Sequence, residues 1–126
     1  LKKKKSKGSK LITVFGCASE RDVEKRPMMG KISTELSDIS IFTAEDPRYE
    51  DVNEIIKQMR DRVKNKKAII YKIPDRFEAI KYAINIAKKG DILAICGKGH
   101  EKSMNFNGIE TPWSDEKSVL KILKKL

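Results

Sequence analysis

Short apolar segments alternate with longer amphipathic segments from residue 11 to the end of the chain. The short segments are rich in β-branched residues, which favours strands, whereas apolar residues spaced three and four apart are typical of helices that cover a core. We expect strands at residues 11–15, 39–43, 68–71 and 92–96, and helices at about residues 26–36, 52–63 and 76–88. The alternation predicts an α/β domain with a mainly parallel sheet flanked by helices.

Turn and cap signals follow the third helix and fill the C-terminal part of the chain. Lys89 and Gly90 are suited to end that helix, through a positive charge and a left-handed cap. Asn107 and Gly108 form a dipeptide typical of tight hairpin turns, so residues 103–113 should form a short β-hairpin. Ser114 is then a suitable N-cap for a last helix that runs to residue 126.

The length of 126 residues favours one domain with a single core. The net charge of +10 is concentrated at the N-terminus, because removing six lysines there from the 28 basic residues leaves 22 against 18 acidic residues, a remainder of +4. We therefore interpret residues 1–10 as a basic linker or tail and residues 11–126 as the domain. The six lysines are Lys2, Lys3, Lys4, Lys5, Lys7 and Lys10.

The composition also bears on location, partners and thiol chemistry. No segment has the roughly 18 uninterrupted apolar residues of a membrane span, and the N-terminus lacks the apolar stretch of a signal peptide, so we expect a cytoplasmic protein. Outside the tail, basic residues do not cluster with aromatic ones, so we do not expect a nucleic-acid partner; the tail alone leaves a basic nucleic-acid-binding module as an alternative. Cys17 and Cys96 each follow an apolar run, which predicts reduced, buried thiols with a structural role.

Three of the four predicted strands end in chemically unusual loops. Residues 16–22 follow the first strand, residues 45–48 the second and residues 97–101 the fourth. Ligands of open α/β sheets bind beyond the carboxyl ends of the strands, so these loops define a candidate site. The third strand leads only into residues 73–75, a plausible turn and helix N-cap, and we assign it no ligand role.

The three loops carry side chains of both signs, namely Arg21, Asp22, Asp46, Arg48, Lys98 and Glu101. A site for a zwitterion needs a guanidinium for its carboxylate and carboxylates for its ammonium, which is what this set offers. For a single loop, a helix cap or a surface ion pair is the simpler explanation. Three charged loops at one edge of the sheet favour an amino acid as the ligand.

The chain carries no recognisable catalytic residue. It has neither G-x-x-x-x-G-K-[ST] nor G-x-G-x-x-G, and the G-K-G at residues 97–99 is weak support for a nucleotide site. His100 is the only histidine and has no Cys or His neighbour at ligand spacing, so we expect no metal site. We interpret it as a structural histidine, with a general base as the alternative. Another domain of a larger enzyme should then supply the reactive machinery.

The motifs resemble the C-terminal domain of the Mur ligases, specifically the UDP-N-acetylmuramoyl-tripeptide synthetase branch. The similarity extends over nearly the whole chain from about residue 11. It is carried by V-F-G-C through R-D to K-R-P-M-M-G at residues 14–30, T-A-E-D-P-R at residues 43–48, G-K-G-H-E at residues 97–101 and T-P-W-S-D at residues 111–115. Each motif is modest alone, but their order and spacing are highly specific.

This resemblance implies a Rossmann-like fold and a role in an ATP-dependent ligase. In that family ATP phosphorylates the carboxylate of UDP-N-acetylmuramoyl-L-alanyl-D-glutamate, and the amine of a diamino acid attacks the acyl phosphate to form an amide. ATP and Mg²⁺ are bound mainly by a central domain that this chain lacks, while the C-terminal domain brings the diamino acid. The partners expected are therefore the diamino acid, the UDP-MurNAc-dipeptide and the other domains of the ligase.

The resemblance also implies individual contacts with the diamino acid. Arg48 would make a forked contact with the distal carboxylate of meso-diaminopimelate, and Asp46 and Glu101 would bind its distal ammonium. L-Lysine has no distal carboxylate and would leave a buried arginine unpaired, which favours diaminopimelate. The substrate-binding residues implied are Arg21, Glu45, Asp46, Pro47, Arg48, Gly97 and Glu101.

Two departures from the family pattern affect the expected specificity. The usual recognition motif is D-N-P-R, and here residues 45–48 read E-D-P-R, so a carboxylate that cannot donate hydrogen bonds replaces an amide. Ala18 and Ser19 stand where glycines are frequent, and Glu20 replaces a frequent Asp. The identity of the diamino acid stays open, and another Mur-like ligase, of the cyanophycin or folylpolyglutamate synthetase type, is the alternative within the same class.

Overall fold

The computed structural model describes residues 8–18, 23–65, 67–98 and 101–126. Most of the predicted basic tail, the candidate site residue Arg21 and the single histidine His100 therefore lie outside the described residues.

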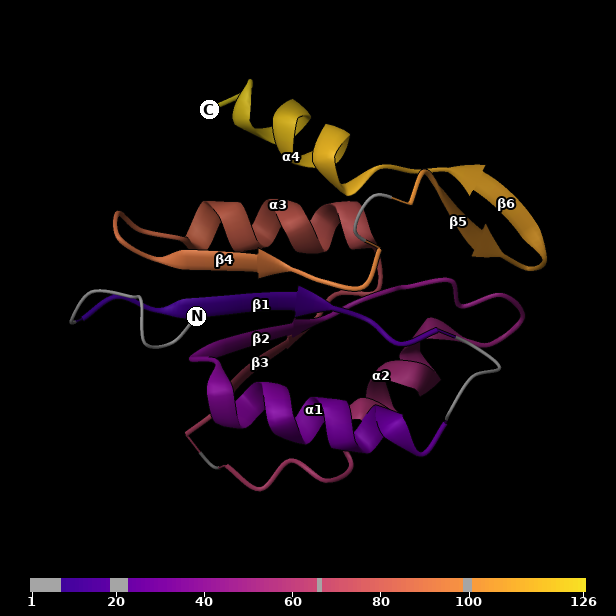
Figure 1. Cartoon of the computed structure of the whole chain (residues 1–126), viewed down its shortest axis with the longest axis horizontal. Coiled ribbons are helices and arrows are strands. Elements are labelled where there is room, and N and C mark those ends of the chain that lie inside the picture. Colours follow the sequence, from indigo (N-terminus) through magenta and orange to yellow (C-terminus); the bar gives the residue numbers. More distant parts are fainter. Residues whose placement is uncertain (1–7, 19–22, 66, 99–100) are drawn as a thin grey trace.

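A four-stranded parallel sheet forms the centre of the domain (Figure 1). Its strands are β1 (Leu11–Phe15), β2 (Ile39–Phe42), β3 (Ile69–Lys72) and β4 (Ile92–Ile95), in the order β3-β2-β1-β4. The helices α1 (Lys25–Leu36), α2 (Val52–Arg60) and α3 (Arg76–Ile86) connect successive strands. An antiparallel hairpin of β5 (Ser103–Phe106) and β6 (Ile109–Pro112) and the helix α4 (Asp115–Leu123) complete the fold. The predicted parallel α/β sheet with a C-terminal hairpin is confirmed.

Helices cover both faces of the sheet, because successive residues of a strand point to opposite sides. In Figure 1, α1 and α2 lie below the sheet, whereas α3 and α4 lie above it. One core cluster joins β1 and β2 to α3 and α4, and the other joins the ends of β1 and β2 to α2. The first contains Ile12, Val14, Ile39, Ile41, Ala79, Ile80, Ala83 and Ile122; the second contains Phe15, Cys17, Phe42, Ile55, Ile56 and Met59.

The predicted helix N-caps and the predicted hairpin turn are confirmed. The Asp75 carboxylate accepts the Glu78 N–H at the start of α3, and the Ser114 hydroxyl accepts the Lys117 N–H at the start of α4. Asn107 and Gly108 have φ angles of 54° and 81°, the pair of positive values that a type I′ turn requires.

Three helices end earlier than their apolar patterns predict. After α2 and α4 the chain continues in tighter i→i+3 hydrogen bonds, from Val63 N–H to the Arg60 carbonyl and from Leu126 N–H to the Leu123 carbonyl. The prediction that Lys89 and Gly90 cap α3 is wrong. That helix ends at Ile86, and Gly90, with φ of 92°, lies in the turn that leads into β4.

The two cysteines differ in exposure. Cys17 is buried, as predicted, but Cys96 is exposed. The prediction for Cys96 is wrong because β4 is an edge strand that pairs only with β1, so the apolar run before this cysteine does not lead into the core. Among the described residues, no helix is long and apolar enough to cross a membrane.

Candidate functional site

The loops that follow β2 and β4 meet at the carboxyl edge of the sheet, joined by an ion-pair cluster. The Lys98 ammonium donates to Asp46 Oδ1 at 2.8 Å and to Glu101 Oε2 at 2.6 Å. These contacts bring together two of the three loops that the sequence singles out. The third candidate loop contains Arg21, which lies outside the described residues, so its place at this edge stays a prediction.

Burial and charge determine the ionisation of this cluster. The Lys98 side chain is only 1% exposed, compared with 19% for Asp46 and 57% for Glu101. Burial acts to lower the pKa of Lys98, but hydrogen bonds to the two carboxylates outweigh it and raise that pKa. Burial acts to raise the pKa of Asp46, but hydrogen bonds from Lys98 and from the Asn105 N–H hold it below its usual value. Lys98 and Asp46 are therefore both charged at neutral pH.

Asp46 and Arg48 adopt left-handed backbone conformations on either side of the buried Pro47. Their φ angles are 41° and 51°. Such values are uncommon for residues other than glycine, and they persist only where the surroundings enforce them. Strained backbone of this kind concentrates at ligand-binding sites, so its occurrence within the E-D-P-R motif is a second indication of a functional loop.

The β5–β6 hairpin holds this strained loop in place. The Arg48 N–H donates to the Asn105 carbonyl at 3.0 Å, and the Asn107 N–H donates to the Arg48 carbonyl. The Asn105 N–H also donates to Asp46 Oδ1 at 2.9 Å. The hairpin thus binds the loop on both sides of Pro47, through the Asp46 side chain and the Arg48 backbone, a contribution that was not predicted from the sequence.

Glu45 packs directly against Gly97 at the centre of the edge. A Cβ atom at Gly97 would lie 2.8 Å from Glu45 Oε2, and the φ of Gly97 is +108°. From the sequence this glycine is attributed to close approach of a ligand; in the structure a Cβ atom here would also displace the Glu45 carboxylate. Burial raises the pKa of Glu45, opposed by the positive charges of Arg76 and Lys98.

The start of the first loop is closely packed and chemically inert. A Cβ atom at Gly16 would collide with the Thr43 carbonyl, so the backbones after β1 and β2 touch here. Burial, with the Glu45 charge as a smaller cause, raises the pKa of the Cys17 thiol to about 11. The thiol contacts Met29 Sδ at 3.7 Å. A thiol that stays protonated is a poor nucleophile, which supports the structural role predicted for Cys17.

Two buried arginines contribute to the site and were missed by sequence analysis. Arg26 is 1% exposed; it donates to both Glu50 oxygens, at 2.9 and 2.7 Å, and to the Ala18 carbonyl at 3.2 Å, which ties the first loop to the segment before α2. Arg76 is 2% exposed and pairs with Asp115 at 2.8 Å. Nothing in the local pattern reveals this second pair, because its members lie 39 residues apart.

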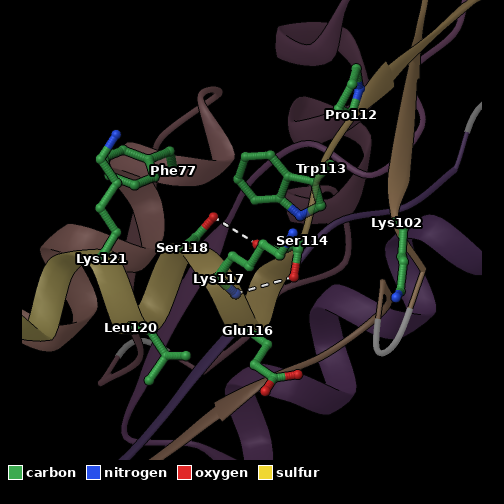
Figure 2. A pocket seen from close by; sticks show the side chains of 10 residues that line it. All are labelled: Phe77, Lys102, Pro112, Trp113, Ser114, Glu116, Lys117, Ser118, Leu120 and Lys121. Atoms are coloured by element: carbon green, nitrogen blue, oxygen red, sulfur yellow. Dashed lines mark hydrogen bonds between the residues drawn. The ribbon is translucent and has the colours of Figure 1, made fainter.

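A pocket of about 560 Å³ lies beside the edge, between the start of α3, the end of β6 and α4 (Figure 2). Its wall includes Phe77, Trp113 and Lys121, and none of the residues in the E-D-P-R motif. The Lys121 ammonium already lies over the Phe77 ring, 5.7 Å from its centroid. We therefore take the charged edge as the candidate site; among the pocket-lining residues, Lys102 directly follows Glu101 of that edge.

The described residues bring charged groups of both signs together at the edge of the sheet. They contain no group of three His, Cys, Asp or Glu side chains that could hold a metal ion. At the edge they place the carboxylates of Asp46 and Glu101, the Arg48 loop and the Gly97 backbone close together. Such a mixed set suits a ligand that bears both ammonium and carboxylate groups.

Comparison with known proteins identifies relatives along most of the chain. Residues 1–99 match the family model described as Mur ligase, glutamate ligase domain. A UDP-N-acetylmuramoyl-L-alanyl-D-glutamate--2,6-diaminopimelate ligase from Aquifex aeolicus is 46% identical over 96% of this chain. A UDP-N-acetylmuramyl-tripeptide synthetase from Treponema denticola is 41% identical over 94% of it. The chain spans 25% and 23% of these two relatives, about a quarter of their length.

A solved structure is also similar to this chain over most of its length. A structure of UDP-N-acetylmuramoyl-L-alanyl-D-glutamate--2,6-diaminopimelate ligase has a TM-score of 0.90 and 34% sequence identity with this chain. The match covers 96% of this chain and 24% of the solved one.

Proposed function

The chain belongs to the Mur ligase family, and from that membership we propose that it is the diamino-acid-binding domain of an ATP-dependent amide-forming ligase. The parent enzyme adds a diamino acid to UDP-N-acetylmuramoyl-L-alanyl-D-glutamate in peptidoglycan precursor synthesis, in the cytoplasm. Relatives at 40 to 50% identity have names that specify this reaction, and they do not favour a nucleic-acid-binding module.

The observation that carries the proposal is the meeting of the E-D-P-R loop and the Gly97–Glu101 loop through Lys98. The hydrogen bonds from Lys98 and from the Asn105 N–H both reach Asp46 Oδ1, and the bond from Lys98 to Glu101 reaches Oε2. We assign the other oxygens, Asp46 Oδ2 and Glu101 Oε1, to the distal ammonium of the diamino acid. Lys98 then fixes the direction in which both carboxylates face the ligand.

Arg48 is assigned to the distal carboxylate of meso-diaminopimelate. Only a planar guanidinium can make two parallel hydrogen bonds to a carboxylate, and the strained backbone around Pro47 fixes where it starts. Gly97 contacts the ligand through its backbone. The Glu45 carboxylate packs against Gly97 and supports the position of its backbone in the site. Arg21 completes the set in this proposal, from the loop after β1.

The residues of this chain do not fit a Mg²⁺–ATP site. The sequence has no phosphate-binding G-x-x-x-x-G-K-[ST], and the described residues hold no candidate metal cluster. We therefore place ATP and Mg²⁺ mainly on the central domain of the parent. It follows that the isolated chain should neither hydrolyse ATP nor form the amide, since positioning and charge stabilisation supply most of the catalysis in phosphoryl transfer.

The proposal is tested by replacing Arg48 with Ala or Lys in the full-length ligase. Loss of a forked, charged contact in a desolvated site costs about 2 to 5 kcal/mol, equivalent to about thirtyfold to several-thousandfold in kcat/KM for meso-diaminopimelate. L-Lysine has no distal carboxylate, so its use relative to diaminopimelate should rise. The assay measures kcat/KM for both diamino acids at saturating ATP.

The control for loss of an arginine is Arg62→Ala, which alters an exposed residue beyond the end of α2. Its kcat/KM values should stay close to those of the wild type. Equal losses for the two diamino acids in the Arg48 variants would show that the distal carboxylate is recognised elsewhere.

A further inference from the structure

Arg76 occupies the first position of α3, directly after the turn to which sequence analysis assigns no ligand role. Its guanidinium is buried and makes four hydrogen bonds. Nη1 donates to the Ala44 carbonyl at 2.9 Å, and Nη2 donates to the Cys96 carbonyl at 3.0 Å. Nε and Nη2 each bind one oxygen of Asp115, both at 2.8 Å. One side chain thus contacts three separate segments of the chain.

The two carbonyls belong to the residues that immediately precede the two binding loops. Ala44 is followed by Glu45 and the E-D-P-R motif, and Cys96 is followed by Gly97. In the sheet, β1 separates β2 from β4, so Arg76 bridges loops that do not follow neighbouring strands. By binding both carbonyls, Arg76 sets the distance between the starts of the two loops, and therefore between the ligand-binding groups that the loops carry.

The orientation of the guanidinium is itself determined by the start of α4. Asp115 is the first residue of that helix and is only 9% exposed in its side chain. Its Oδ1 also accepts the Trp113 indole N–H at 2.7 Å, and Ser114 between them caps the helix. Figure 2 shows Trp113 and Ser114 together at this junction. The Trp113 hydrogen bond thus helps to orient the carboxylate that binds Arg76.

From this geometry we propose that Arg76 is a positioning residue for the diamino-acid site, oriented by Asp115. The inference rests on the proposed function and deepens it. Arg76 does not touch the ligand; it sets the spacing of the loops that do. A buried ion pair is by itself weak support even for a stabilising role, so the inference stands on the carbonyls that the guanidinium holds. A lysine cannot replace it, because an ammonium lacks the planar fork that reaches several acceptors at once.

The test uses Arg76→Lys in the full-length ligase. We expect KM for the diamino acid to rise by about tenfold or more, since misplacement of a binding group by about 1 Å can cost about 100-fold. KM for ATP should stay within about twofold. Asp115→Asn keeps the shape but removes the charge, so it should shift the same KM in the same direction, and the double variant should be no worse than Arg76→Lys alone.

The matched control is Ile122→Ala, which removes a core side chain of α4 that is 5% exposed and leaves the Arg76–Asp115 pair intact. It destabilises the docking of α4 without releasing the loops. Arg76→Lys should therefore raise KM for the diamino acid much more than Ile122→Ala at an equal loss of thermal stability. Equal KM values in the two variants would overturn the inference.

Amide hydrogen exchange in the full-length enzyme tests the positioning separately from the reaction. Arg76→Lys should speed exchange in peptides that cover residues 43–48 and 95–98, whereas Ile122→Ala should speed it mainly in α4. Unchanged exchange in the two loops would overturn the inference whatever the activity. If the wild-type enzyme does not ligate a diamino acid, the proposed function is overturned. Faster exchange in the two loops of Arg76→Lys would in that case still show that Arg76 sets their spacing.

Discussion

Replacing Lys98 with Met tests whether the ion-pair cluster at the sheet edge is held by one buried cation. Methionine keeps most of the side-chain volume and removes the charge. The ion pair between Lys98 and Glu101 contributes only about 0.5 kcal/mol to stability, because the Glu101 carboxylate is 57% exposed. The ion pair between Lys98 and Asp46 contributes more, about 1.5 to 3 kcal/mol, because the Asp46 carboxylate is only 19% exposed and would lose a charged donor. The variant should therefore lose about 2 to 3.5 kcal/mol of unfolding free energy at pH 7.

The pH dependence gives a second signature of the same interaction. The pKa of Asp46 is lowered in the folded chain, so its contribution to stability is present above the ordinary value of 3.8 and is lost as the pH falls through the lowered pKa. Lys98 stays charged throughout this range. The difference between wild type and Lys98→Met should therefore shrink as the pH is taken below 3.8.

Urea denaturation of both proteins at pH 7 and in acid measures these differences. The control is Lys31→Met, which removes one partner of the exposed Lys31–Glu35 pair on α1. That change should cost less than about 0.5 kcal/mol at either pH. The reasoning is refuted if Lys98→Met costs no more than Lys31→Met, or if its cost does not fall in acid.

Three further changes probe close packing and burial. Gly30→Ala should improve the propensity of α1 by about 1 kcal/mol, yet the added Cβ would collide with the Met59 backbone, so calorimetry should show a net loss of at least about 1 kcal/mol. Burial raises the pKa of Glu45, so the stability it contributes is present below pH 4.5 and lost as the pH rises; Glu45→Gln should be more stable than wild type at pH 7, and titration of thermal stability should show that gain vanish in acid. Gly97→Ala should lower the unfolding free energy by about 1 to 3 kcal/mol. This loss should be larger than that of the control Gly8→Ala, because Gly8 has a similar positive φ but its added Cβ would meet nothing within 4 Å. Equal losses in urea denaturation would contradict the role assigned to Glu45.

The local order of the chain was predictable because periodicity and caps act over a few residues. The strand at residues 11–15, the strand predicted at 92–96 and observed at 92–95, the cap at Ser114 and the turn at Asn107 were each predicted from their neighbours in sequence. The parallel sheet followed from the alternation of strands and helices, and the candidate loops followed from the sheet, since parallel strands bring their carboxyl ends to one edge.

The motif residues were also identified in advance, but their roles at the edge were not. Lys98 reads as a ligand-facing charge in sequence, whereas in the structure its ammonium is buried between Asp46 and Glu101. Gly97 reads as a backbone that approaches a ligand, whereas it also makes room for Glu45. The contact of Lys98 with Asp46 joins residues 52 positions apart, and the contact of Gly97 with Glu45 spans a similar distance in sequence.

The sequence by itself thus determined which elements form, that the loops after β2 and β4 share an edge, and which family the motifs resemble. Only the tertiary structure decided that Arg76 and Asp115 form a buried pair, that the hairpin backbone holds Arg48 in a left-handed conformation, and that Cys96 is exposed on an edge strand. The physical reason is range: helix caps and hydrophobic periods are set by neighbours in the chain, whereas the burial of a charge and its partner depend on segments that meet only after the chain has folded.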